Sequence, residues 1–364
     1  MNKKAVWGIV AVVIIVLIAL TISNVSNKKP FEVITGKPIV IGAPLSLSGA
    51  AVQDGESIKN GLEMAKADLA KKGVNVDIIY QDDQTDGKGT VSAIRALAAK
   101  GAQALIGPTW SFLADAGVPV ADQLGLVTVM PANTSEYVGA KSPYAFFTTI
   151  KVHQLVPALA QWLKDNDKKS IAIVSNQGSW YSTVEKAVRE AAASVGASIV
   201  FTDTLVFGQE ASTLPTVLTK MKASKADVLF MEVDSDDGVA VMFKKIRELG
   251  MTQDIMSIST SLGRVLRANP DGFNFSNKVY VLAPKTSEAF TSKYESVYGQ
   301  KPSAYADTAY DSLMLLVDAI ENKGSLPLAD YLRTKTNYKG LSHEYKFDSN
   351  GDIVGGEWVV DMVK

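Results

Sequence analysis

The sequence predicts an α/β protein of two lobes, each built on a doubly wound parallel sheet, with one N-terminal transmembrane helix in front of them. Three observations lead to this prediction: an apolar run at residues 5–22, a repeated alternation of buried strands with amphipathic helices, and the length of the chain. Roughly 330 residues follow the apolar run and a polar spacer, more than one hydrophobic core usually serves. We therefore expect two domains of ordinary size.

The apolar run AVWGIVAVVIIVLIALTI follows Lys3 and Lys4. It is close to the roughly 20 residues that span a bilayer, and it is long for the core of a signal peptide. No clean small-x-small cleavage pattern follows it, so we favour a retained anchor and keep a cleaved signal peptide as the alternative. Positive charge before the span predicts that everything after it is exported, with residues 1–36 as anchor and tether.

From Pro38 onward, short buried strands alternate with helices that have one apolar face. This alternation predicts parallel sheets with right-handed crossovers. The expected strands are 38–49, 76–86, 104–111 and 126–135, then 169–176, 198–206, 226–234 and 254–260. The expected helices are 56–72, 90–101 and 112–125, then 153–166, 183–196, 213–223 and 238–249.

The composition argues against several classes of function. Lys and Arg number 37 against 38 Asp and Glu, which leaves no excess positive charge for nucleic acid. Cysteine is absent, so the chain has no disulfide, no thiolate nucleophile and no cysteine to carry a lipid. The two histidines, His153 and His343, stand in no motif typical of a zinc site or a catalytic relay. We expect no enzyme activity, no metal and no cofactor.

The loops that leave the strands are the candidate binding site, because ligands of open parallel sheets bind outside the carboxyl ends of the strands. The first lobe offers hydroxyls and backbone N–H groups, some at helix starts, where partial positive charge favours a carboxylate. The second lobe offers Glu232 and Asp234, either of which could receive an ammonium group. The six loops are 45–49, 107–111 and 130–135, then 176–181, 232–234 and 259–261.

Seven segments, taken together and in order, resemble the branched-chain-amino-acid-type solute-binding proteins of ABC importers over residues 37–364. They are IGAPLSLSG, YQDDQTD, IGPTWS, VMPANTSE, IAIVSNQGSWY, YADTAYDSLMLLVDA and FDSNGD. The resemblance implies a type I periplasmic-binding-protein fold, whose two lobes are joined by three crossovers, here near Thr149, Ala283 and Ser342. It places 37–150 with 284–342 in the first lobe, and 151–283 with 343–364 in the second.

The same resemblance implies the ligand contacts of the first lobe. The Ser111 hydroxyl would meet a ligand carboxylate, with Thr109 and Trp110 beside it. Ala132 would use its backbone carbonyl, and Thr134 its hydroxyl, to hold the ammonium and carboxylate groups. Ser111 and Thr134 could instead simply cap helices, as Ser and Thr often do at such positions.

In the second lobe the resemblance implies that Trp180 covers the ligand. In the first lobe, the loop with Ser48 belongs to the segments that carry the resemblance, and we count Ser48 among the candidate ligand-binding residues. Ser259 falls where the family commonly has a glutamate that neutralises the ammonium, so Asp234, or Glu232 beside it, would take over that charge. Asp54 stands near a place where the family often has an aromatic ring. These departures leave an amino acid, an amide or a small carboxylate open as the ligand.

The prediction is an extracytoplasmic solute-binding protein that closes two lobes on a small polar ligand and delivers it to an ABC permease. We expect it to be a monomer, tethered to the membrane by its N-terminal helix. A sensing module that presents its ligand to a partner receptor is the alternative, and an enzyme is the third possibility.

Overall fold

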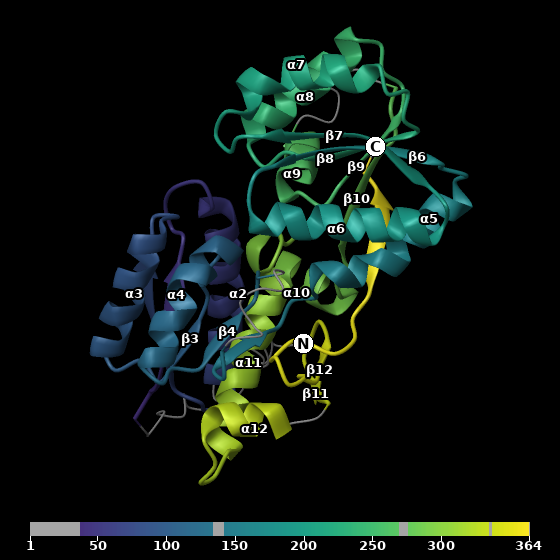
Figure 1. Ribbon diagram of the computed structural model, residues 1–364. Helices are drawn as coiled ribbons and strands as arrows, with labels where there is room; N and C mark the ends of the chain where they lie inside the picture. The colour runs from purple at the N-terminus through teal and green to yellow at the C-terminus, as the bar shows by residue number, and fades with distance from the viewer. Residues whose placement is uncertain (1–36, 134–141, 269–275, 335–336, 364) are drawn as a thin grey trace, which may run out of the picture.

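The computed structural model describes residues 37–133, 142–268, 276–334 and 337–363, which form two lobes, each built on its own sheet (Figure 1). Within these ranges no helix combines the length and the apolar character that a membrane crossing requires. The expected anchor and tether, residues 1–36, lie outside the described residues.

The first lobe contains a five-stranded parallel sheet in the order β2-β1-β3-β4-β5. Its strands are β1 (Ile39–Leu45), β2 (Val76–Asp82), β3 (Ala104–Ile106), β4 (Thr128–Met130) and β5 (Ala145–Phe147). Its helices are α2 (Val52–Lys71), α3 (Gly87–Ala99), α4 (Ser111–Gln123), α10 (Glu288–Tyr298), α11 (Ala306–Asn322) and α12 (Leu328–Thr334). A hairpin of β11 (Tyr338–Lys339) and β12 (Glu344–Tyr345) completes the lobe.

The second lobe contains a six-stranded sheet in the order β13-β10-β9-β8-β6-β7, parallel except for β13. Its strands are β6 (Ser170–Asn176), β7 (Ser198–Leu205), β8 (Val228–Glu232), β9 (Asp254–Ser257), β10 (Val279–Pro284) and β13 (Trp358–Met362). Its helices are η2 (Val152–Leu155), α5 (Val156–Asp165), α6 (Ser179–Ser194), α7 (Glu210–Lys222), α8 (Asp236–Glu248) and α9 (Thr260–Ala268).

Several helices begin earlier than the apolar periodicity predicts. α2 begins at Val52, α6 at Ser179 and α7 at Glu210, three or four residues before the expected starts at 56, 183 and 213. Their first turns do not continue the apolar stripe from which the helix starts were predicted. The difference matters for function, because it brings the first turns of α2 and α6 to the cavity described below.

The third crossover lies later in the chain than the expected position near Ser342. Tyr345, Phe347 and Ile353 are buried in the core of the first lobe, and Phe347 pairs with Ile353 across a tight turn. The expectation that residues 343–353 belong to the second lobe is therefore wrong. Their short pieces of strand hold apolar residues that only the first lobe covers, and the chain crosses at about residues 354–357, just before β13 begins.

An ion pair connects the first crossover with the segment that leads into the third. The side chain of Lys151 is 1 % exposed, and its Nζ lies 3.0 Å from a carboxylate oxygen of Asp352. The indole of Trp358 donates a hydrogen bond of 3.1 Å to the Lys151 carbonyl. Two of the three connections between the lobes are thus bound to each other.

Helices α2 and α11 pack closely in the first lobe. A Cβ atom added at Gly61 of α2 would lie 2.1 Å from the carbonyl oxygen of Ala306, the first residue of α11. Only glycine permits this approach. The contact holds the start of α11, and with it the preceding Tyr305, near the first turn of α2.

Candidate functional site

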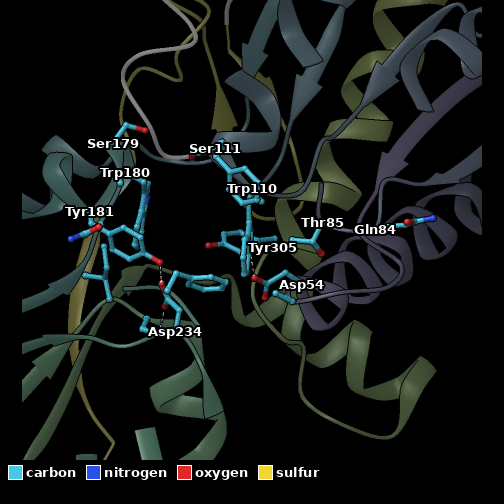
Figure 2. A pocket seen from close by; sticks show the side chains of 18 residues that line it. Asp54, Gln84, Thr85, Trp110, Ser111, Ser179, Trp180, Tyr181, Asp234 and Tyr305 are labelled. Carbon is cyan, nitrogen blue, oxygen red and sulfur yellow. Dashed lines mark hydrogen bonds between the residues drawn. The ribbon is translucent and has the colours of Figure 1, made fainter. Parts of the chain in front are cut away.

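A cavity of about 480 Å³ lies between the lobes, and side chains from both lobes line it (Figure 2). From the first lobe come Ala50, Asp54, Gln84, Thr85, Trp110, Ser111, Phe112, Ala132 and Tyr305. From the second come Gln177, Gly178, Ser179, Trp180, Tyr181, Phe207, Asp234, Ile258 and Ser259.

The start of α4 forms one wall of the cavity. Ser111 is the first residue of this helix and lines the cavity, although only 7 % of its surface is exposed. Trp110 occupies the N-cap position without making a capping hydrogen bond. The first N–H groups of a helix have no partners within it, and they favour negative charge. Together with the Ser111 hydroxyl they suit a carboxylate.

Asp54 lies in the first turn of α2 and faces the same cavity. One of its carboxylate oxygens accepts a hydrogen bond of 2.8 Å from the Trp110 indole. The other has no hydrogen-bond partner among the described residues, and the residue is 5 % exposed. Burial raises the pKa of Asp54 to about 6, against the opposing effect of the Trp110 hydrogen bond. The first lobe therefore contributes to the cavity wall a carboxylate whose second oxygen is buried without a hydrogen-bond partner among the described residues.

A second carboxylate, Asp234, follows β8 on the opposite wall. It accepts hydrogen bonds of 2.5 Å from the Tyr181 hydroxyl and 2.6 Å from the Ser259 hydroxyl. Burial raises the pKa of Asp234, while these two hydroxyls lower it. The two donors fix the orientation of the carboxylate at the cavity surface, where a cation could approach it.

Glu232, the alternative partner for an ammonium group, does not line the cavity. It is fully buried and accepts hydrogen bonds from the Ser257 hydroxyl, at 2.9 Å, and the Ile258 amide, at 2.7 Å. Burial first, and then the nearby Asp234, raise the pKa of Glu232 to about 8. A group with this pKa is mostly neutral at pH 7, so Asp234 is the better candidate.

Aromatic rings cover much of the remaining wall. Trp110 of the first lobe meets Phe207 of the second edge to face, with ring centroids 6.2 Å apart. Trp180 and Tyr181 pack in the same way at 4.9 Å. Tyr305 precedes α11 in the left-handed conformation, with φ of 70°, and its ring lies between the Asp54 side and the Asp234 side of the view in Figure 2. The cavity is thus both aromatic and acidic.

Of the residues predicted to bind ligand, the structure brings together Trp110, Ser111, Ala132, Trp180 and Asp234. Thr109 and Ser48 do not line the cavity. Thr109 is buried and accepts a hydrogen bond from the Ser46 amide, and the Ser48 hydroxyl donates to Asp82. Both side chains hold the loop after β1. Thr134 lies outside the described residues.

Tyr181, Phe207 and Tyr305 are among the lining residues that were not predicted to bind ligand. Tyr181 lies in a loop that the strand-end rule does select, so its position was the available signal. Tyr305 follows the second crossover and belongs to no strand end, so that rule does not reach it. Asp54 was noted only as a departure from the family pattern.

The sequence and fold can be compared with known proteins. Residues 38–360 match the family model described as "Periplasmic binding protein". A Leu/Ile/Val-binding protein of Citrobacter freundii is 23 % identical over 358 residues, covering 94 % of this chain and 93 % of the relative.

Two solved structures share the fold at low identity. A leucine-binding protein of Thermotoga maritima has a TM-score of 0.78 at 19 % identity, covering 90 % of this chain and 95 % of its own. A solute-binding protein of Rhodopseudomonas palustris in complex with 3,4-dihydroxybenzoic acid has a TM-score of 0.74 at 18 % identity, covering 89 % and 96 %. With the family match over 38–360, we conclude that the chain belongs to the periplasmic binding proteins, the solute-binding components of ABC transporters, and not to an enzyme family.

Proposed function

We propose that this chain captures a small α-amino acid between its lobes and delivers it to an ABC permease. The observation that carries the proposal is the placement of Ser111 at the start of α4 on one wall and Asp234 on the opposite wall of one cavity. An α-amino acid has a carboxylate and an ammonium on one carbon, and these two walls suit those two groups. The Leu/Ile/Val-binding relative supports the same ligand class.

In this proposal the ligand first binds the first lobe, through the Ser111 hydroxyl and the free N–H groups of α4. The backbone carbonyl of Ala132 and the Thr134 hydroxyl add to this half of the site. The second lobe then closes, bringing Asp234 to the ammonium and Trp180 over the ligand. Hinge closure of this kind buries the ligand between two lobes.

An aromatic carboxylic acid is the second candidate ligand, because of the aromatic lining and the relative that binds 3,4-dihydroxybenzoic acid. The charges oppose it. Asp54 and Asp234 both line the cavity, and none of the described lining residues is Lys, Arg or His. A simple anion would therefore meet two carboxylates and no cationic side chain in the described lining of the cavity.

We further propose that residues 1–36 tether the binding lobes to the outer face of the cell membrane as a monomer. The chain has no cysteine that could carry a lipid, and the apolar run could serve instead. The mass of the protein extracted from membranes tests this: an intact N-terminus supports the tether, and loss of the apolar run contradicts it.

Calorimetry with leucine as the probe tests the carboxylate site. Ser111→Ala removes one charge-assisted hydrogen bond, so we expect the affinity to fall about 10- to 100-fold. Ser48→Ala is the matched control, since its hydroxyl binds Asp82 outside the cavity, and it should leave the affinity unchanged. Equal affinities for both variants would remove Ser111 from the site. If 3,4-dihydroxybenzoate binds and no α-amino acid does, the proposed ligand class is wrong.

The ammonium site has its own test. Asp234→Asn keeps the shape and the hydrogen-bonding capacity towards Tyr181 but removes the charge. We expect leucine to bind about tenfold or more weakly, because an ion pair becomes a neutral contact. A variant that binds leucine as tightly as the parent would show that the ammonium is held elsewhere.

A further inference from the structure

We infer that the ligand is an amino acid with a second amine on its side chain, and that Asp54 binds this amine. The inference rests on the proposed function and extends it, because Asp54 is a second acidic position at the far side of the cavity from Asp234. Figure 2 shows Asp54 beside Trp110, with Asp234 on the opposite wall next to Tyr181.

The hydrogen bonding of Asp54 is incomplete. Only the Trp110 indole donates to it among the described residues, and its second oxygen is buried without a partner. Leaving a buried carboxylate oxygen unpaired is costly, since the group loses its water without a replacement. Asp234 differs, because two hydroxyls already donate to it. A hydrogen-bond donor on the ligand would give the second carboxylate oxygen of Asp54 the partner that it lacks among the described residues.

The charge balance of the cavity points the same way. Arg264 acts on both carboxylates, but its guanidinium is occupied by Asp236, at 2.7 Å, and by the Ser261 hydroxyl, at 2.8 Å. A ligand with one ammonium can neutralise only one of the two carboxylates. A ligand with one carboxylate and two amines can pair one ammonium with Asp54 and the other with Asp234. The carboxylate of the ligand then binds the start of α4.

The surroundings of Asp54 favour a cation in a separate subsite. The rings of Trp110 and Tyr305 lie beside it in Figure 2, and aromatic faces attract an ammonium group. Asp54 and Asp234 lie on opposite walls of the cavity in Figure 2, so the two carboxylates are separate positions. One ammonium shared between them is therefore the less favoured arrangement.

Three pairs of isosteric amino acids test the inference by calorimetry at pH 7.5 with the full-length chain. They are 2,4-diaminobutyrate with norvaline, ornithine with norleucine, and lysine with 2-aminoheptanoate. Each pair exchanges a terminal ammonium for a methyl group at one chain length, so the series also finds the spacing. We expect at least one diamino acid to bind about tenfold or more tightly than its isostere.

Asp54→Asn should remove this preference and change the affinity for the apolar isostere by less than about threefold. Ser111→Ala is the control, since it should weaken both members of a pair equally. The comparison within the unaltered protein does not depend on how well any variant folds.

The outcomes are distinct. If every apolar isostere binds as tightly as its diamino partner, the inference is overturned and the proposed function stands. If Asp54→Asn weakens both members equally, the two carboxylates share one ammonium, which also overturns it. If none of the six amino acids binds, the inference and the proposed function fall together.

Discussion

Asp54 lines the cavity, and the burial of its carboxylate lowers the free energy of unfolding at neutral pH. Its pKa of about 6 lies above the ordinary value of 3.8, so the folded protein binds this proton more tightly than the unfolded chain does. The contribution of Asp54 to stability is therefore most favourable below pH 3.8, and it declines as the pH rises to about 6. The shift corresponds to about 3 kcal/mol at neutral pH.

We accordingly expect Asp54→Asn to raise the free energy of unfolding at pH 7.5 by up to about 3 kcal/mol, and to change it little at pH 4. Urea denaturation at the two pH values measures both. The charged groups that act on Asp54 are Arg264 and Asp234, and neither is altered by the substitution. An equal effect at both pH values would contradict this account of its titration.

Whether a site residue could be predicted depends on whether it follows the end of a strand. Ser111, Trp180 and Asp234 come directly after strands of a parallel sheet, and that topology places their loops at one edge. The environment of Asp54 depends on Trp110, 56 positions away, and a periodicity of 3.6 residues carries no information about such a partner. Ser48 lies in a loop that follows a strand, where ligand contacts were expected, but its hydroxyl donates a hydrogen bond to the carboxylate of Asp82.

At the scale of elements, the contact between α2 and α11 sets one side of the cavity. Gly61→Ala would place a methyl group 2.1 Å from the carbonyl oxygen of Ala306, and the helices must separate to admit it. We expect the free energy of unfolding to fall by about 1–3 kcal/mol, as overpacking does elsewhere.

The matched control for Gly61→Ala is Gly87→Ala at the start of α3, where the nearest atom would be the Cβ of Ala116 at 3.3 Å. Alanine favours helix more than glycine does, so this variant should be neutral or slightly more stable. Thermal denaturation compares the two. Equal stability of both variants would show that the helix crossing tolerates separation.

The elements that periodicity did not predict are β5 and every helix and strand from α9 onward. β5 has three residues, and β11 and β12 have two each, too few to show a period of two. Tyr345 and Phe347 alternate with polar residues over too short a stretch to predict a strand, yet both are buried in the first lobe. The position of the third crossover was implied by the family resemblance and not by periodicity, whereas the strands and helices between residues 38 and 260 other than β5 were predicted from their periodicity.

At the scale of the whole molecule, the ion pair of Lys151 and Asp352 joins two of the chain segments that connect the lobes. Asp352→Asn would leave the charge of Lys151 buried without this carboxylate, so we expect a loss of about 3 kcal/mol in the free energy of unfolding. Glu357→Gln is the control, because its pair with Lys285 is more than half exposed and should contribute much less to the free energy of unfolding.

Urea denaturation of these two variants tests this role of the buried pair. A loss that is no larger for Asp352→Asn than for Glu357→Gln would show that the crossovers are held by packing alone. Small-angle X-ray scattering of the same samples would then show whether the distance between the lobes has changed.

The antiparallel pairing of β13 with β10 has a consequence for how the chain reaches its native state. β10 has β9 on one side, and until residues 358–362 are made its other side is an open row of unpaired N–H and C=O groups. The first lobe likewise lacks α11 until residues 306–322 exist. Neither lobe can be completed early in synthesis, although domains often fold one after another. A chain stopped before Trp358 would therefore expose a strand edge prone to aggregation, and its second lobe would remain unfinished.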